Sequence, residues 1–253
     1  MKKIYVIGIG PGSYENLTVR ADRALREADT IIGYTVYIEL VKAYYPEKEY
    51  LSTPMKREVD RCRLAFEEAK KEKKVAMVCS GDAGVYGMAG LMYEIGETYL
   101  EVSLEIIPGI TAALGGGAIL GAPLSHDFAV ISLSDLLTPW ETIEQRLHAA
   151  AKADFCMALY NPSSRKRHDY LQKACDIFLQ YRSPDTICGI AKNIARDAEE
   201  KRIVTLQELR DTQVDMFTTV FIGNQSTREI GGKMVTPRGY SVKRTTKSSK
   251  DAD

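Results

Sequence analysis

The stretch from Val75 to Met88 constrains the fold of this chain more than any other segment. Its first five residues, Val75 to Cys79, are apolar or small, which is typical of a short strand buried on both faces. Ser-Gly-Asp-Ala-Gly follows at once, and apolar residues recur at helical spacing from Met88 onward. A strand, a small-residue loop and a helix in this order predict a ligand site at the carboxyl edge of a parallel sheet.

The single carboxylate of this loop, Asp82, has two interpretations. It could cap the helix that follows. It could also contact a ligand, because the glycines of the loop allow a close approach to the backbone. The stretch alone favours neither interpretation.

An earlier glycine-rich turn follows a β-branched strand and reads Gly8-Ile9-Gly10-Pro11-Gly12. It departs from the dinucleotide pattern G-x-G-x-x-G, because Ser13 stands where the third glycine is required. Pro11 also lacks the backbone N–H that would donate to a pyrophosphate. The next strand ends in Tyr34 rather than in an acidic residue for a ribose. These departures disfavour a nicotinamide oxidoreductase.

Strand and helix patterns alternate four times in the first half, which predicts a parallel sheet covered by helices on both faces. The expected strands are 4–7, 31–34, 75–79 and 104–107, and the polar segment from Ala43 to Arg57 is expected to be a loop. The second half has expected strands at 128–133, 155–160, 186–191, 201–205 and 218–222, with helices at about 141–152 and 166–180. Only one helix-length connection lies among the last three strands, so this sheet is expected to be mixed.

The prediction is therefore an α/β fold with two domains. Residues 1–115 would hold a mainly parallel sheet, and residues 116–240 a mixed sheet. The polar tail at 241–253 lacks apolar periodicity, so we expect it to be disordered. Near the boundary, Thr111 could cap a small-residue helix that runs to Leu120. Gly115-Gly116-Gly117 is costly inside a helix, so either a neighbour packs very close there or the chain changes direction.

The charge balance excludes some classes of protein. The chain has 34 Lys+Arg and 34 Asp+Glu among 253 residues, so it has no global attraction to nucleic acid or to an anionic membrane. No apolar run approaches the roughly 20 residues of a membrane-spanning helix. The apolar start is too short for a secretory signal. The five scattered cysteines predict small core residues in a reducing compartment, without zinc or disulfides. We expect a cytoplasmic protein.

Three motifs together resemble the tetrapyrrole methyltransferases of cobalamin and sirohaem synthesis. They are Gly8-Ile9-Gly10-Pro11-Gly12, Ser80-Gly81-Asp82-Ala83-Gly84-Val85-Tyr86-Gly87 and Pro108-Gly109-Ile110-Thr111-Ala112, and the resemblance covers residues 1 to about 240. Further motifs in the second half are His126-Asp127-Phe128, Ser132 to Trp140, Tyr160-Asn161-Pro162 and Met234 to Tyr240. They resemble the branch of this family that methylates carbon 17 of precorrin-3B or cobalt-precorrin-3 and contracts the ring. A sister enzyme acting on another ring carbon is the alternative.

The resemblance implies a homodimer of two-domain chains, with S-adenosylmethionine bound in the cleft between the domains and no protein-bound metal. Domain interfaces and strand ends are also the usual physical places for such a site. The residues that the resemblance implies at the cofactor are Gly10, Pro11, Ser80, Gly81, Asp82, Val85, Thr111, Ala112, Tyr160 and Asn161. Asp82 would then contact the ribose or the amine of the cofactor.

Ring contraction, as the resemblance implies it, moves protons and needs a positioned acid or base. Histidine suits this role best, and His126 is the only one of three histidines in a loop expected at the cleft. Ser132, Ser134 and Asp135 follow a predicted strand and could orient the substrate or His126. These four are the candidate catalytic residues, although His126 could instead be only a turn residue.

The implied tetrapyrrole substrate carries many carboxylates, so a chain of zero net charge must place cations at the cleft. The cations in predicted loops or at strand ends are Lys56, Arg57, Arg165, Lys192 and Arg238. Each alone is more often a solvated surface charge. As a group they could bind the acetate and propionate arms of the substrate.

Overall fold

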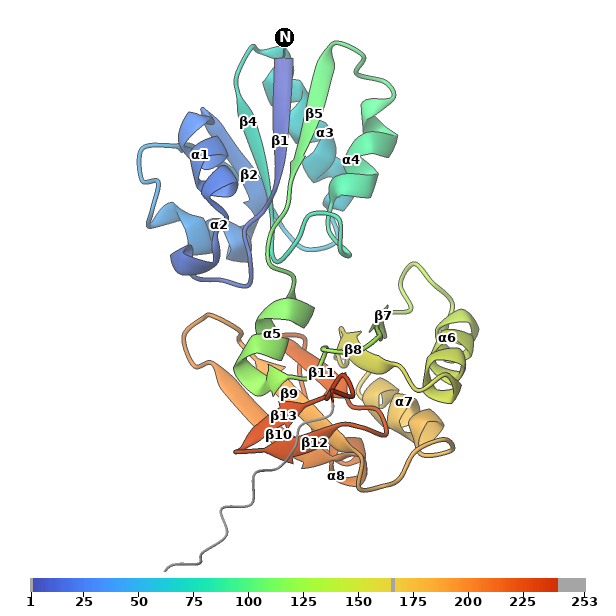
Figure 1. The fold of residues 1–253 in the computed structure, drawn as a ribbon. Coiled ribbons are helices and arrows are strands. Elements are labelled where there is room, and N and C mark those ends of the chain that lie inside the picture. The colour runs from blue at the N-terminus through green and yellow to red at the C-terminus, as the bar shows by residue number, and fades with distance from the viewer. Residues whose placement is uncertain (1, 165–166, 241–253) are drawn as a thin grey trace, which may run out of the picture.

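The structure is a computed structural model that describes residues 2–164 and 167–240. The predicted tail at 241–253 and the candidate Arg165 lie outside the described residues. Each half of the chain forms its own five-stranded sheet. Figure 1 shows the two halves one above the other, joined where β5 (Val102–Ile107) leads into α5 (Ala112–Leu120).

The first sheet is entirely parallel, as the alternation of strand and helix patterns predicts. Its strands β1 (Lys2–Gly8), β2 (Thr30–Tyr34), β3 (Glu49–Thr53), β4 (Val75–Cys79) and β5 lie in the order β3-β2-β4-β1-β5. α1 (Val19–Glu27) and α2 (Thr35–Lys42) pack on one face, and α3 (Glu58–Lys70) and α4 (Ala89–Gly96) pack on the other. A short 3-10 helix, η1 (Tyr14–Asn16), precedes α1. The prediction that 75–79 is buried on both faces is confirmed.

The prediction of a loop from Ala43 to Arg57 is wrong, because this segment contains β3. β3 lies at the edge of the sheet, beside β2 only. Its residues are half-buried or exposed, so the sequence of this strand has no apolar run to reveal it. An edge strand needs little apolar surface, because only one side of its backbone pairs with another strand and the other side faces solvent.

The second sheet is mixed, as predicted. β7 (Phe128–Ser132), β8 (Cys156–Tyr160), β9 (Ile187–Lys192), β10 (Glu200–Thr205) and β11 (Thr218–Ile222) lie in the order β10-β9-β11-β8-β7. Only the β7–β8 pair is parallel among these neighbours. α6 (Trp140–Lys152), α7 (Tyr170–Phe178) and α8 (Leu206–Arg210) cover one face. α5 covers the other, together with Met234 from the small sheet of β6 (Gly121–Ala122), β12 (Arg228–Ile230) and β13 (Lys233–Val235).

The glycines of α5 allow this helix to lie close against the second sheet. A Cβ at Gly116 would stand 2.9 Å from the ring of Phe221 and 3.1 Å from Cβ of Ala191. The helix continues through all three glycines, so the chain does not change direction there, and close packing explains Gly116 and Gly115 but not Gly117. The predicted domain boundary between residues 115 and 116 falls inside α5, and it stays a prediction.

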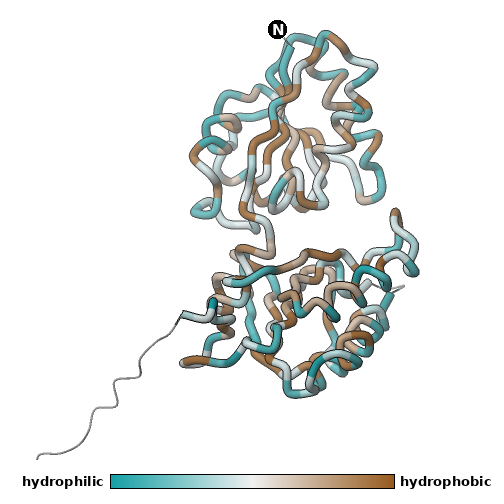
Figure 2. The backbone as a smooth tube through the Cα atoms, turned by 45° about the vertical axis from the view of Figure 1, so that its right-hand side comes forward, coloured by the Kyte–Doolittle hydropathy of each residue, from teal (hydrophilic) through white to brown (hydrophobic). Residues whose placement is uncertain are grey.

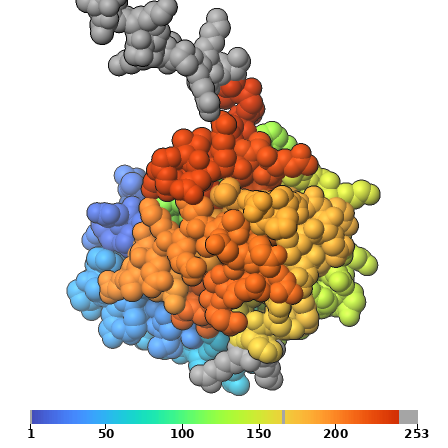
Figure 3. Space-filling model, turned by 90° about the horizontal axis from the view of Figure 1, so that it is seen from below, coloured from blue at the N-terminus to red at the C-terminus, as the bar shows by residue number. Residues whose placement is uncertain are grey.

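Apolar residues gather in the strands of both sheets, as the brown segments of Figure 2 show. All five cysteines are buried, in strands or in helices, which confirms them as core residues. The face in Figure 3 is formed mainly by the second half of the chain, with β12 and β13 along one side. No helix in the described ranges is long and apolar enough to cross a membrane.

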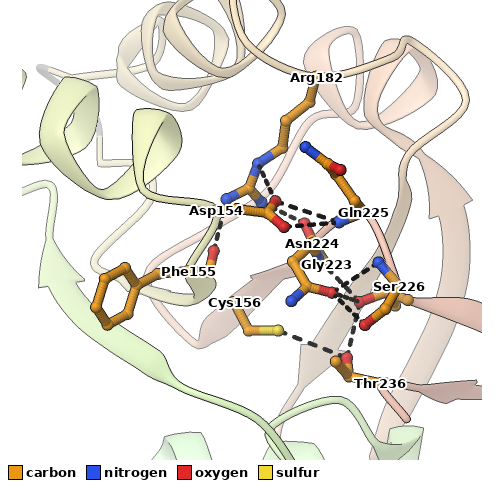
Figure 4. A network of polar contacts seen from close by, with 10 residues as sticks. Asp154, Phe155, Cys156, Arg182, Gly223, Asn224, Gln225, Ser226 and Thr236 are labelled. Carbon is orange, nitrogen blue, oxygen red and sulfur yellow. Dashed lines mark hydrogen bonds and ion pairs between the residues drawn. The ribbon is translucent and has the colours of Figure 1, made fainter. Parts of the chain in front are cut away.

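A buried arginine joins two strands of the second sheet at one end (Figure 4). The Nη2 of Arg182 donates to the carbonyl oxygen of Phe155 at 2.6 Å, and Nη1 donates to the carbonyl oxygen of Gly223. Its Nε lies 3.9 Å from the carboxylate of Asp154 and has no hydrogen bond. Burial lowers the pKa of Arg182, because a charged guanidinium loses hydration there. Phe155 precedes β8 and Gly223 follows β11, so Arg182 fixes the end of the sheet away from Tyr160.

Candidate active site

The three glycine-rich loops meet because β4, β1 and β5 are neighbours in the first sheet. All three strands are parallel, so the loops at 8–12, 80–87 and 108–112 leave the same edge. Gly10 and Gly81 exchange two backbone hydrogen bonds of 3.0 and 2.7 Å. Both glycines have a positive φ, 71° and 68°, that favours a residue without Cβ. Backbone bonds therefore fix the first loop to the second.

Asp82 fixes the second loop to the third. One oxygen of its carboxylate accepts from the backbone N–H of Gly84 at 2.7 Å, and the other accepts from Gly109 at 2.9 Å. The helix after this loop begins only at Ala89, so Asp82 is not its cap. The carboxylate is used within the protein, and the structure leaves its predicted contact with a ribose or amine as a prediction.

The second half of the chain meets these loops through Tyr160, at the carboxyl end of β8. Its hydroxyl accepts from the backbone N–H of Ala113 at 2.6 Å and lies 2.5 Å from Oγ1 of Thr111. Thr111 is at the N-cap position of α5, as predicted, but its side chain makes no capping hydrogen bond. Burial raises the pKa of Tyr160, so the hydroxyl keeps its proton at neutral pH.

A pocket of about 220 Å³ lies between the two sheets, where these loops meet the strand ends of the second half. Eight of the ten residues expected at the cofactor line it: Pro11, Ser80, Gly81, Val85, Thr111, Ala112, Tyr160 and Asn161. Gly10 and Asp82 do not line the pocket but join its loops to one another. Motifs separated by up to about 150 residues in the sequence therefore lie side by side around one cavity.

Comparison with protein families identifies this arrangement. The family model of the tetrapyrrole (corrin/porphyrin) methylases matches residues 3–210. The chain belongs to the tetrapyrrole methylase family. The resemblance stated from the sequence motifs is thereby confirmed, and so is the predicted α/β fold class.

Individual relatives of this tetrapyrrole methylase are similar over nearly all of the chain. A cobalt-factor III methyltransferase of Priestia megaterium is 48% identical over 96% of this chain, which spans about half (46%) of that protein. A probable cobalt-factor III C(17)-methyltransferase of Salmonella typhimurium is 46% identical over 94% of this chain and 99% of that protein. The crystal structure of the methyltransferase CobJ superposes with a TM-score of 0.86 at 36% identity, covering 94% of this chain and 100% of that one.

A more distant structure shows the shared fold alone. The uroporphyrin-III C-methyltransferase of Thermus thermophilus, solved in complex with S-adenosylhomocysteine, has a TM-score of 0.68 at 21% identity. It covers 87% of this chain and 92% of that protein.

Sequence reasoning missed several residues that line the pocket of this methylase. They are Tyr34, Tyr37, Tyr86, Asn193, Ile194, Arg196 and the segment from Met216 to Thr219. Tyr86 reaches the second sheet, where its hydroxyl donates to the carbonyl oxygen of Val130 and accepts from the N–H of Ser132, both at 3.1 Å. Position relative to strand ends could have revealed Arg196, which follows β9 at the same edge as Tyr160.

Ser132 is the candidate catalytic residue nearest to this pocket. Its hydroxyl accepts from the side-chain amide of Asn161, a pocket residue, at 2.9 Å. Ser134 and Asp135 instead bind Arg167, at 2.5 and 3.2 Å. The hydroxyl of Tyr170 donates to Asp135 at 2.7 Å. Tyr170 and Arg167 lower the pKa of Asp135, so this carboxylate is ionised at neutral pH.

The structure does not bring His126 to the pocket. His126 precedes the first residue of β7, whereas Ser132 is the last. Six extended residues span roughly 20 Å, so His126 lies at the opposite end of the strand from the pocket. Its imidazole is half exposed, and its Nδ1 accepts from the N–H of Asp127 at 2.9 Å. This is the geometry of a turn residue, the alternative weighed from the sequence.

The four described cations expected at the substrate do not gather at this pocket. Arg57 pairs with Asp60 at 2.5 Å, and Lys192 pairs with Asp215 at 3.0 Å. Lys56 is exposed in the loop after β3, and Arg238 is exposed after β13. Across the described part of the chain, no group of three or more His, Cys, Asp or Glu side chains could hold a metal ion.

Proposed function

We propose that this tetrapyrrole methylase transfers a methyl group from S-adenosylmethionine to carbon 17 of precorrin-3B or its cobalt counterpart, with ring contraction, in cobalamin biosynthesis. The pocket between the two sheets carries the proposal, because loops from both halves line it and eight of the ten residues expected at the cofactor are among them. The names of the relatives at 46% and 48% identity support a cobalt-containing substrate, and the name of the relative at 46% also supports carbon 17.

The pocket lining suits S-adenosylmethionine. Tyr34, Tyr37 and Phe217 offer aromatic surface for a purine ring, and the hydroxyls of Thr111 and Tyr160 and the amide of Asn161 offer polar contacts. Gly81 exposes its backbone to the pocket without a side chain, so a bulky ligand can lie directly against the loop.

The cofactor supplies a methyl group on a positively charged sulfur, which a nucleophilic carbon attacks. The contribution of the protein to such a transfer is mainly alignment of the two molecules. The Gly10–Gly81 hydrogen bonds and the Asp82 carboxylate hold the loops in place before anything binds. Tyr160 holds the first turn of α5. The loops can therefore bind the donor without first being ordered.

For the steps of ring contraction we place Ser132 at the substrate, together with Asn161, to which it is hydrogen-bonded. Asp135 orients the loop after β7 through Arg167 and Tyr170, and it is not the proton donor because it is ionised. Removing the Ser132 hydroxyl should slow product formation by about 10²-fold or more if it positions a group that transfers a proton.

The decisive experiment uses S-adenosylmethionine labelled with ¹³C in its methyl group. The purified protein is incubated separately with metal-free precorrin-3B and with its cobalt counterpart, and the product is identified by mass and by ¹³C NMR. Label on carbon 17 of a contracted ring is the expected result. Label on another ring carbon would identify a sister methyltransferase, and an uncontracted methylated product would remove ring contraction from the proposal.

The same proposal includes three further expectations, on the oligomeric state, the cellular location and the need for a metal. We expect a homodimer, which light scattering after size-exclusion chromatography would measure as twice the mass of the chain. We expect the protein in the cytoplasmic fraction of lysed cells. We also expect the protein to keep its full activity, on whichever of the two substrates it accepts, after the protein is dialysed against a chelator, because sulfonium methyl transfer needs no resident metal.

A further inference from the structure

Arg196 is the one Lys or Arg among the described residues that lines the pocket between the sheets. It belongs to the loop after β9, and its guanidinium reaches across to the first half of the chain. Its Nε donates to the carbonyl oxygen of Pro11 at 2.7 Å, and its Nη2 donates to Oγ of Ser80 at 2.9 Å. Arg196 therefore contacts two of the three glycine-rich loops.

The positive charge of Arg196 has no counter-ion in the described ranges. Both acceptors are neutral, and no described carboxylate lies within ion-pair distance of the guanidinium. Burial lowers the pKa of Arg196, and Tyr37 acts in the opposite direction, but an arginine keeps its proton at neutral pH. Three of its five N–H groups have no partner among the described residues. A half-buried guanidinium in this state is expected to bind an anion.

Gly12 makes room for this arginine. A Cβ at Gly12 would collide with Cγ of Arg196 and lie 2.9 Å from the carbonyl oxygen of Ala195. The last glycine of the first motif therefore does not serve phosphate binding, for which the motif has the wrong spacing. Gly12 instead leaves space for the side chain of Arg196 from the other half of the chain.

We propose that Arg196 binds a carboxylate of a molecule held in this pocket. The carboxylate is either that of the amino-acid end of S-adenosylmethionine or that of an acetate or propionate arm of the tetrapyrrole. This inference rests on the proposed function, because that function brings both carboxylates to the pocket. The fork of N–H groups left free on the guanidinium matches a carboxylate, which accepts two parallel hydrogen bonds.

Calorimetry with three ligands separates the two sources. S-Adenosylhomocysteine has the carboxylate, 5′-methylthioadenosine has the same nucleoside and sulfur without the amino-acid end, and precorrin-3B tests the substrate. Arg196→Gln should weaken at least one of the two carboxylate ligands by about 10- to 100-fold, and 5′-methylthioadenosine by less than about 3-fold. Arg196→Lys should restore part of the lost affinity, and Arg23→Gln, an exposed arginine on α1, is the control.

A loss confined to S-adenosylhomocysteine assigns the carboxylate to the cofactor, and a loss confined to precorrin-3B assigns it to the substrate. Equal losses for S-adenosylhomocysteine and 5′-methylthioadenosine would mean that Arg196 only holds the loops, which overturns the inference. No loss for any ligand also overturns it, while the proposed function stands. If the parent protein itself binds neither adenosine ligand, the proposed function fails first.

A second variant keeps the inference testable if Arg196→Gln does not fold. Gly12→Ala leaves the guanidinium of Arg196 intact, but the added Cβ pushes the Arg196 side chain away from its position beside Pro11 and Ser80. It should reproduce the same selective loss of the carboxylate ligand. Loss of 5′-methylthioadenosine to the same extent would again contradict the inference.

Discussion

Two hydrogen-bonding side chains determine the shape of the pocket loops. Asp82 accepts from Gly84 and Gly109, and Tyr160 accepts from Ala113, so each joins backbone that is distant in the sequence. These donors come from loops and from the first turn of a helix, which have no partner in the sheets. The side chains thus satisfy backbone groups that the cofactor would otherwise have to order.

Asp82→Ala should lower the free energy of unfolding by about 1.5–3 kcal/mol, because hydrogen bonds to a charged group are lost. S-Adenosylhomocysteine should also bind more weakly, since the third loop is no longer held against the second. Urea unfolding and calorimetry measure the two effects. Asp185→Ala removes an exposed carboxylate with no side-chain partner among the described residues, and it is the control. Weaker binding with unchanged stability would instead favour direct contact between Asp82 and the cofactor.

Two elements of the second half, α5 and the loop after β7, are held in place close to the pocket. α5 lies against the second sheet because Gly116 leaves space for the Phe221 ring. The loop after β7 is held by Asp135, which binds Arg167 from the segment before α7 and Tyr170 at the first residue of that helix. The position of α5 thus depends on the missing side chain of Gly116, and the position of the loop after β7 depends on the charge of Asp135.

Gly116→Ala and Gly117→Ala form a matched pair on α5. The Cβ at 116 would press on the Phe221 ring, so overpacking should cost about 1–3 kcal/mol of stability. The Cβ at 117 would meet nothing closer than 3.7 Å, so the higher helix propensity of alanine should add about 0.5–1 kcal/mol. Thermal or urea unfolding measures both. Equal effects at the two positions would refute the close packing of α5.

Asp135→Asn should destabilise the protein in a pH-dependent way. The partners of Asp135 lower its pKa in the folded state, so its contribution is present above the unfolded value of about 4 and is lost as the pH falls through the folded value. The carboxylate is 33% exposed, so the contribution at pH 7 should not exceed about 1 kcal/mol. Urea unfolding of parent and variant should differ at pH 7, and the difference should shrink as the pH falls through the folded value. A constant difference would show that the charge of Asp135 is irrelevant.

Tyr86 and Arg196 connect the two halves of the chain on either side of the pocket. Tyr86 extends from the first half to β7, and Arg196 extends from the second half to Pro11 and Ser80. Both side chains line the pocket. The relative position of the two sheets therefore depends on residues that also face the ligand.

Tyr86→Phe should loosen the contact between the halves without unfolding either one. The hydroxyl bonds to Val130 and Ser132 are lost, so the amide of Ser132 should exchange its hydrogen faster. The global free energy of unfolding should change by less than about 1 kcal/mol, since hydrogen bonds of exposed groups contribute little. Hydrogen exchange of a peptide covering 130–134 measures this. Tyr93→Phe, an equally exposed tyrosine on α4, should leave it unchanged.

The sequence predicts the structural features that are determined by residues adjacent in the chain. Four of the five strands of the first sheet, the three glycine-rich loops and much of the pocket between the sheets follow from runs such as Val75–Cys79 and from motifs beside them, whereas β3 has no such run. Arg196 and Tyr86 could not be predicted in this way, because their partners lie in the other half. The sequence favours His126 at the cleft for its chemistry and for its position in a loop, and only the strand direction shows that it lies at the far end of β7.

The contact between Arg196 and Pro11 forms late during synthesis, because the chain leaves the ribosome from its N-terminus. The first sheet is complete at Ile107, and Arg196 is synthesised roughly 90 residues later, which takes about 5–18 s at 5–20 residues per second. During this time the glycine-rich loops are finished but lack the side chains that close the pocket. We therefore expect the newly made first half to keep its fold without the second half, and S-adenosylmethionine to act on the later docking of the two halves. Nascent chains that carry residues 1–112, followed by a linker long enough to bring them out of the ribosome, should resist proteolysis equally with and without the cofactor.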